Sequence, residues 1–112
     1  MESLKDKIIS WLKTRTIKDI VYLKKNYIFS IFGKHPGISE FDAHKLVLKP
    51  EKIISVEFSI SHQDRLIIIR AFSKNYDTAF IILDPFDDKV AAEFKNKIVI
   101  LTIYPLRSSN RN

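Results

Sequence analysis

Residues 61–75, SHQDRLIIIRAFSKN, constrain the fold of this chain most strongly, because they separate two sheet topologies. Residues 66–69 favour a strand by β propensity. Residues 61–64 match a helix capping box, and Leu66, Ile69 and Phe72 repeat at helical spacing. We favour the helix, because apolar strands joined by helical crossovers predict a mixed α/β sheet flanked by helices. A strand here predicts an antiparallel α+β sheet with two helices instead.

The other elements follow from capping residues and hydrophobic period. A capping box at residues 3–6 predicts a helix over residues 3–14. The apolar residues within residues 17–32 would fit a second helix, but the β-branched and aromatic residues at 27–32 favour a strand or hairpin that turns at Lys25 and Asn26. Further strands are expected at residues 41–48, 53–60, 79–83 and 98–104, and a short helix at residues 87–95. With a helix at residues 61–75, the expected order is α-β-β-β-α-β-α-β.

Length and composition predict one globular domain. The 112 residues suffice for a single core, so we expect a domain over residues 1–106 and a loose polar tail over residues 107–112. The chain has no cysteine, which excludes disulfides and thiolate metal sites. We expect a cytoplasmic protein, since no apolar run approaches the roughly 20 residues of a membrane span. Abundant Ile and Lys with a single Gln are typical of a thermophile.

The net charge of +6 is spread unevenly. Residues 1–34 hold eight Lys/Arg against three Asp/Glu, and residues 35–112 hold eleven against ten. A basic face attracts polyanions such as nucleic acid and makes their binding salt-dependent. A solvated helix face with no ligand is the alternative reading of these lysines.

One segment resembles a nuclease motif. Residues 37–59, GISEFDAHKLVLKPEKIISVEFS, are similar to the core of the PD-(D/E)XK nuclease superfamily, which includes restriction-endonuclease-like proteins and archaeal Holliday-junction resolvases. Asp42 matches the motif aspartate, and Glu57 matches the glutamate of the E-x-K strand. Ser59 stands where that family has lysine, and Glu2 stands near its helix-one acid.

The resemblance implies a magnesium-dependent phosphodiesterase site. Asp42 and Glu57 would hold Mg²⁺ between neighbouring strands, which supplies a nucleophilic water and stabilises phosphate charge. His44 would serve as a further ligand or base, and Ser59 leaves the site without the lysine charge. Because Ser59 weighs against catalysis, a decayed relative that only binds nucleic acid is the alternative reading. The expected nucleic-acid contacts are Lys34, Arg65 and Arg70.

Other readings remain open. The expected partner is nucleic acid, with DNA favoured and no membrane, and small domains of this kind often act as homodimers. A non-catalytic assembly module would use the apolar final strand or the helices as its interface. An antiparallel sheet would resemble a pleckstrin-homology-like domain. A zinc site is a minor alternative, built from His35, Asp42, His44 and His62.

Overall fold

A computed structural model of the chain describes residues 2–23 and 40–107. The described part holds two α-helices, α1 (Leu4–Leu12) and α3 (Glu40–Leu48), and three 3₁₀ turns, η1 (Ile17–Asp19), η2 (Pro50–Lys52) and η3 (Ala92–Phe94). Its five strands are β1 (Ile20–Tyr22), β2 (Ile53–Phe58), β3 (Arg65–Ala71), β4 (Tyr76–Leu83) and β5 (Ile98–Arg107).

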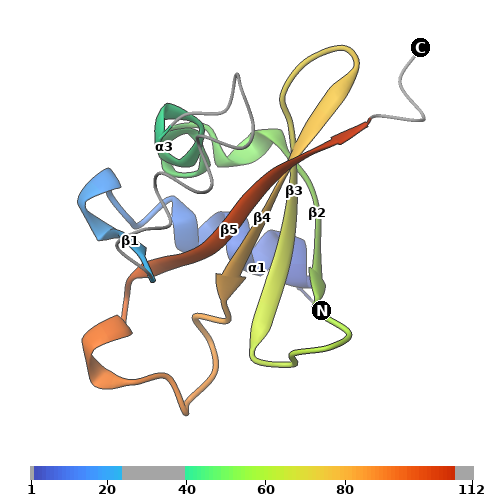
Figure 1. Cartoon of the computed structure of the whole chain (residues 1–112). Helices are drawn as coiled ribbons and strands as arrows, with labels where there is room; N and C mark the ends of the chain where they lie inside the picture. The colour runs from blue at the N-terminus through green and yellow to red at the C-terminus, as the bar shows by residue number, and fades with distance from the viewer. Residues whose placement is uncertain (1, 24–39, 108–112) are drawn as a thin grey trace.

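The strands form one mixed sheet in the order β1-β5-β4-β3-β2 (Figure 1). Four consecutive strands, β2 to β5, pair antiparallel, and β1 pairs parallel with β5. The expected mixed α/β sheet with helices packed against it is confirmed at this level. The antiparallel run from β2 to β5 is the feature that the alternative topology predicted.

The prediction of a helix at residues 61–75 is wrong, because these residues contain β3. Residues 59–64 form the turn from β2, in which the His62 backbone N–H donates to Ser59 Oγ at 3.3 Å. Every second residue of β3 is buried, namely Leu66, Ile68 and Arg70. Pairing with strands on both sides decides the structure, since any contiguous apolar run also contains helical spacings.

The strand expected at residues 41–48 is also wrong. These residues form the helix α3, in which Lys45 Nζ lies 3.6 Å from Asp42 Oδ1, one turn earlier. Ala43 and Leu46 lie three residues apart and are both fully buried, which is helical periodicity. Pro50 follows at the start of η2, where proline is well tolerated.

The helix expected at residues 87–95 is reduced to turns and the 3₁₀ turn η3. Asp84 Oδ1 accepts from the Phe86 N–H, and Asp87 Oδ1 accepts from the Lys89 N–H, each at 2.9 Å. Such side-chain bonds to the backbone compete with helix formation. At the other end of the chain, a strand within residues 17–32 is found as β1, and its expected turn at Lys25 and Asn26 lies outside the described residues.

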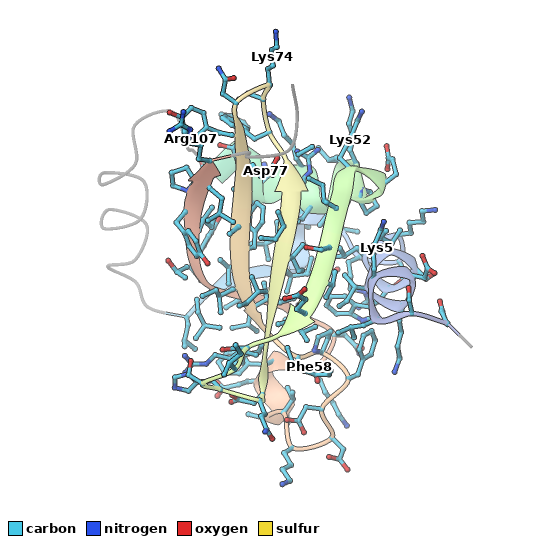
Figure 2. All side chains as sticks on the ribbon, turned by 90° about the vertical axis from the view of Figure 1, so that its right-hand side faces the viewer. Lys5, Lys52, Phe58, Lys74, Asp77 and Arg107 are labelled. Atoms are coloured by element: carbon cyan, nitrogen blue, oxygen red, sulfur yellow. The ribbon has the colours of Figure 1, made fainter. Side chains whose placement is uncertain are left out.

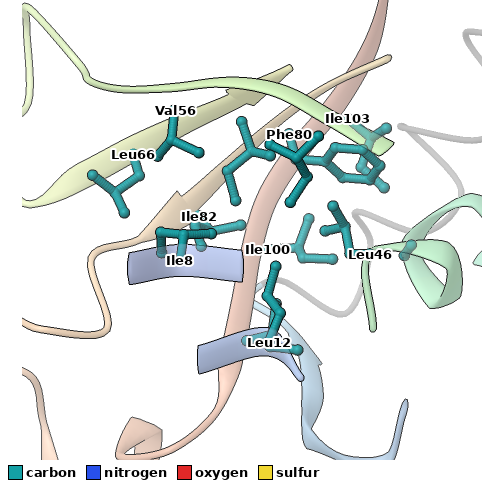
Figure 3. Packing of buried hydrophobic residues seen from close by; sticks show 13 residues of the cluster. Ile8, Leu12, Leu46, Val56, Leu66, Phe80, Ile82, Ile100 and Ile103 are labelled. Atoms are coloured by element: carbon teal, nitrogen blue, oxygen red, sulfur yellow. The ribbon is translucent and has the colours of Figure 1, made fainter. Parts of the chain in front are cut away.

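Both described helices contribute to one core with the sheet (Figure 3). The helix α1 begins as expected, since Ser3 Oγ accepts from the Asp6 N–H at 3.1 Å. It buries Ile8 and Leu12, and α3 buries Leu46 in the same cluster. The strands supply the remaining members, among them Val56, Leu66, Phe80, Ile82, Ile100 and Ile103. This shared core fixes α3 and η2 beside one end of β3.

Candidate anion-binding pocket

Asp42, the first expected magnesium ligand, lies in the first turn of α3 and is buried. Besides its ion pair with Lys45, its negative charge acts on the guanidinium of Arg70 in β3. The carboxylate of Asp42 therefore lies among basic side chains and acts as a counter-charge to them.

Glu57, the second expected ligand, is exposed on β2 and pairs with Ile67 of β3. Paired residues of antiparallel strands share a face, and Ile67 and Arg70 are on opposite faces because side chains alternate. Arg70 is also three residues further along β3, about 10 Å away. Glu57 is thus directed away from the surroundings of Asp42. Among the described residues, no group of three or more His, Cys, Asp or Glu side chains could hold a metal ion.

The two remaining catalytic candidates have local contacts. Ser59 closes the turn between β2 and β3, where its backbone N–H donates to the Arg65 carbonyl at 2.9 Å. His44 lies on α3, with its ring 5.8 Å from that of Phe41 in an edge-on arrangement. The described structure therefore does not gather Asp42, Glu57, Ser59 and His44 into one site.

Two of the three expected nucleic-acid contacts lie in the described residues, and these two are separated. Lys34, like the zinc candidate His35, lies outside the described residues. Arg65 begins β3 and pairs with Leu83, so it lies at the end of the strand opposite Arg70. Of Arg65 and Arg70, only Arg70 lines a basic pocket.

This basic pocket has a volume of about 300 Å³ and collects four positive side chains. Lys45 comes from α3, Lys49 from the residue that joins α3 to η2, Lys52 from η2 and Arg70 from β3. Backbone and side-chain atoms of residues 71–73 complete the lining. We use the name basic pocket for this group of residues. Segments distant in sequence thus place four cations around one cavity.

Arg70 is the buried member, with 6% of its surface exposed. Its Nη1 donates to the Ala71 carbonyl at 3.0 Å, while its buried Nε–H has no hydrogen-bond partner in the described structure. Burial lowers the pKa of Arg70, and the charges of Asp42 and Glu51 oppose that shift. A buried donor without a partner costs roughly 1–3 kcal/mol.

An aromatic ring forms part of the pocket wall. Phe72 is 40% exposed, and Lys45 Nζ lies 5.9 Å from the centre of its ring. Figure 2 shows Lys52, Lys74 and Arg107 at one end of the sheet and Phe58 at the opposite end. A second pocket, lined by Phe58, Ser59, Ile60 and Gln63, has no charged side chain. The basic pocket and the Ser59 region are therefore electrostatically different surfaces.

The sequence contains a signal for this pocket, but the signal cannot be recognised when residues 41–48 are predicted to be a strand. Lys45, Lys49 and Lys52 have the spacing i, i+4 and i+7, which is typical of one helix face, although α3 ends at Leu48 and Lys49 itself is not helical. Phe72 and Arg70 join them only through the pairing of β3 with β2 and β4, which no local pattern reveals.

No protein-family model, curated protein or solved structure matches the chain. None of the helices within residues 2–23 and 40–107 is long and apolar enough to cross a membrane. The interpretation of the basic pocket rests on its geometry and charge.

Proposed function

We propose that the protein binds single-stranded nucleic acid at the basic pocket and does not cut it. The observation that carries this proposal is the convergence of Lys45, Lys49, Lys52 and Arg70 beside the half-exposed ring of Phe72. Proteins that bind single strands combine a positive groove for the phosphates with aromatic rings on which bases stack. Both components occur here within one cavity.

Neighbouring side chains extend the same surface. Tyr76, at the start of β4, is 49% exposed and pairs with Arg107 at the end of β5. Lys74 lies in the hairpin between β3 and β4, at the same end of the sheet (Figure 2). A strand that leaves the pocket would therefore meet a further aromatic ring and further positive charge. The overall charge of +6 would draw such a polyanion in at long range.

Binding without cleavage is the form of the nuclease-like prediction that the geometry favours. Cleavage by the expected mechanism needs Asp42 and Glu57 around one magnesium ion. These residues belong to α3 and to an exposed face of β2, and β3 occupies the segment where the nuclease-like order expects a helix. Three parts of the sequence-based prediction remain predictions. They are the restriction-endonuclease-like fold, the use of Mg²⁺ and the preference for DNA.

The assembly-module alternative would use only part of β5. Residues 98–100 of β5 pair with β1, and residues 98–101 and 103 are buried. An assembly interface would therefore use the less buried end of β5, at residues 104–107, or the helices.

The proposal is tested with two variants that carry the same net charge. Lys45, Lys49 and Lys52 are changed to Gln in the first variant. The control changes Lys5, Lys89 and Lys95, which are exposed and lie on α1 or in the connection between β4 and β5. Each variant loses three positive charges, so only the location of the loss differs. Binding is measured by fluorescence anisotropy with labelled DNA and RNA strands of about ten nucleotides.

We expect the pocket variant to lose affinity by roughly tenfold to a hundredfold and the control by much less. The slope of log K against log salt should shrink by about 2 in the pocket variant, since each lost contact on a single strand contributes about 0.7. Equal losses of affinity in both variants would show that binding depends on net charge alone and not on the basic pocket. Absence of binding by the unmodified protein would refute the function.

A further inference from the structure

We infer that the basic pocket holds the terminal phosphate group of a nucleic-acid strand, so that the protein recognises phosphorylated strand ends. This inference rests on the proposed function, because it names the part of the strand that enters the pocket. It would not follow from surface lysines alone, since these contact any phosphate along a backbone.

Arg70 gives the pocket a buried, positively charged side chain. Arg70 has 6% of its surface exposed and lines the cavity, and its buried Nε–H has no hydrogen-bond partner in the described structure. An arginine presents its N–H donors in a planar fork that fits two oxygens of one phosphate group. A phosphate in the pocket would accept from the guanidinium of Arg70, which lines the cavity.

The charges around the pocket favour a terminal phosphate over an internal one. Four cations line it, and the two carboxylates that act on Arg70, Asp42 and Glu51, leave an excess of two positive charges. A terminal phosphate carries about −1.5 to −2 charges at neutral pH and three acceptor oxygens. An internal phosphodiester carries one negative charge and two non-bridging oxygens. The terminal group therefore matches the excess charge more closely than an internal phosphodiester does.

The dimensions of the pocket suit a strand end. Its volume of about 300 Å³ is near the lower limit of small-molecule sites, enough for a phosphate with its sugar. Phe72 forms one wall and is exposed on its outer side, where the first base of the strand could stack.

Competition binding tests this inference. A labelled single strand without terminal phosphates is displaced by unlabelled strands of the same sequence that carry a 5′-phosphate, a 3′-phosphate or neither. Inorganic phosphate at matched concentration is the fourth competitor. The proteins are the unmodified chain, Arg70→Lys and Lys49→Gln. Arg65→Lys is the matched control, because the buried Nε–H of Arg65 also has no hydrogen-bond partner in the described structure, although it lies 3.9 Å from Asp64 Oδ1, and Arg65 is at the other end of β3.

We expect one of the phosphorylated strands to compete about tenfold better than the unphosphorylated strand, the size of one charge-assisted hydrogen bond. Arg70→Lys and Lys49→Gln should reduce this preference below about threefold, while Arg65→Lys should retain it. Lys49 is exposed, so its variant tests the pocket even if Arg70→Lys fails to fold.

Three results would overturn the inference. Equal competition by all strands would leave general nucleic-acid binding in place and remove end recognition. Equal potency of inorganic phosphate would identify a site for the free anion. Retention of the preference in both pocket variants would place the phosphate elsewhere. Failure of the unphosphorylated labelled strand to bind at all would instead refute the proposed function.

Discussion

Truncation of two leucines of α3 should have very different effects on stability. Leu46 is fully buried in the core, whereas Leu48 is 66% exposed. In a helix, residues two apart point in different directions; in the strand expected from sequence, they would share a face. The pair Leu46→Ala and Leu48→Ala therefore separates the two structures with the same chemical change.

The magnitude follows from burial. Removal of a fully buried leucine side chain costs about 2–5 kcal/mol, because the lost transfer energy adds to that of the cavity. For a domain of this size, a loss of about 3 kcal/mol lowers the midpoint of thermal unfolding by about 12 °C. Leu48→Ala removes a largely exposed side chain, so its cost should be about 0.5 kcal/mol or less.

Urea and thermal unfolding followed by circular dichroism measure both variants. The dependence of the free energy of unfolding on urea should be unchanged, so that the shift in midpoint reports stability. Similar losses for Leu46→Ala and Leu48→Ala would refute the helical assignment of residues 40–48. They would also remove the scaffold that places Lys45 in the basic pocket.

Three further predictions concern single side chains. Burial, with a contribution from Glu40, raises the pKa of Tyr22 from 10.0 to about 12. The unfolded chain loses this proton first, so stability should fall between about pH 10 and 12, and Tyr22→Phe should reduce that loss in alkaline unfolding experiments. Ser59→Ala should cost about 1 kcal/mol in urea unfolding, because Ser59 Oγ accepts from the His62 N–H in the turn, and an unchanged midpoint would contradict that role. Glu57→Ala should leave strand binding unchanged, and neither it nor the unmodified protein should cut DNA in excess Mg²⁺; cleavage lost on this substitution would restore the metal-site hypothesis.

The elements predicted from sequence are those with strong local signals. The helix α1 has both a capping box at Ser3 and apolar residues at helical spacing, and β2 has an alternating apolar face. The segments of β3 and α3 were assigned wrongly, because short apolar runs satisfy both periods. Pairing with neighbouring strands decides β3, and burial of Ala43 and Leu46 against the sheet stabilises α3.

The candidate site was less accessible to sequence reasoning than the fold. Arg70 is among the nucleic-acid contacts expected from sequence, and it lines the basic pocket. The expected closeness of Asp42 and Glu57 depended on two adjacent strands, and one of those strands is the helix α3. The lysine spacing becomes informative once α3 and the 3₁₀ turn η2 that follows it are known. Phe72 joins the basic pocket only through tertiary structure.

Nuclear magnetic resonance mapping tests the central claim most directly. Backbone amide signals are recorded while a single strand of about ten nucleotides is added to the unmodified protein. Binding at the basic pocket predicts that the largest shifts fall in residues 45–52 and 70–74. Largest shifts in residues 57–65, or on α1, would contradict the assignment of the nucleic-acid site to this pocket.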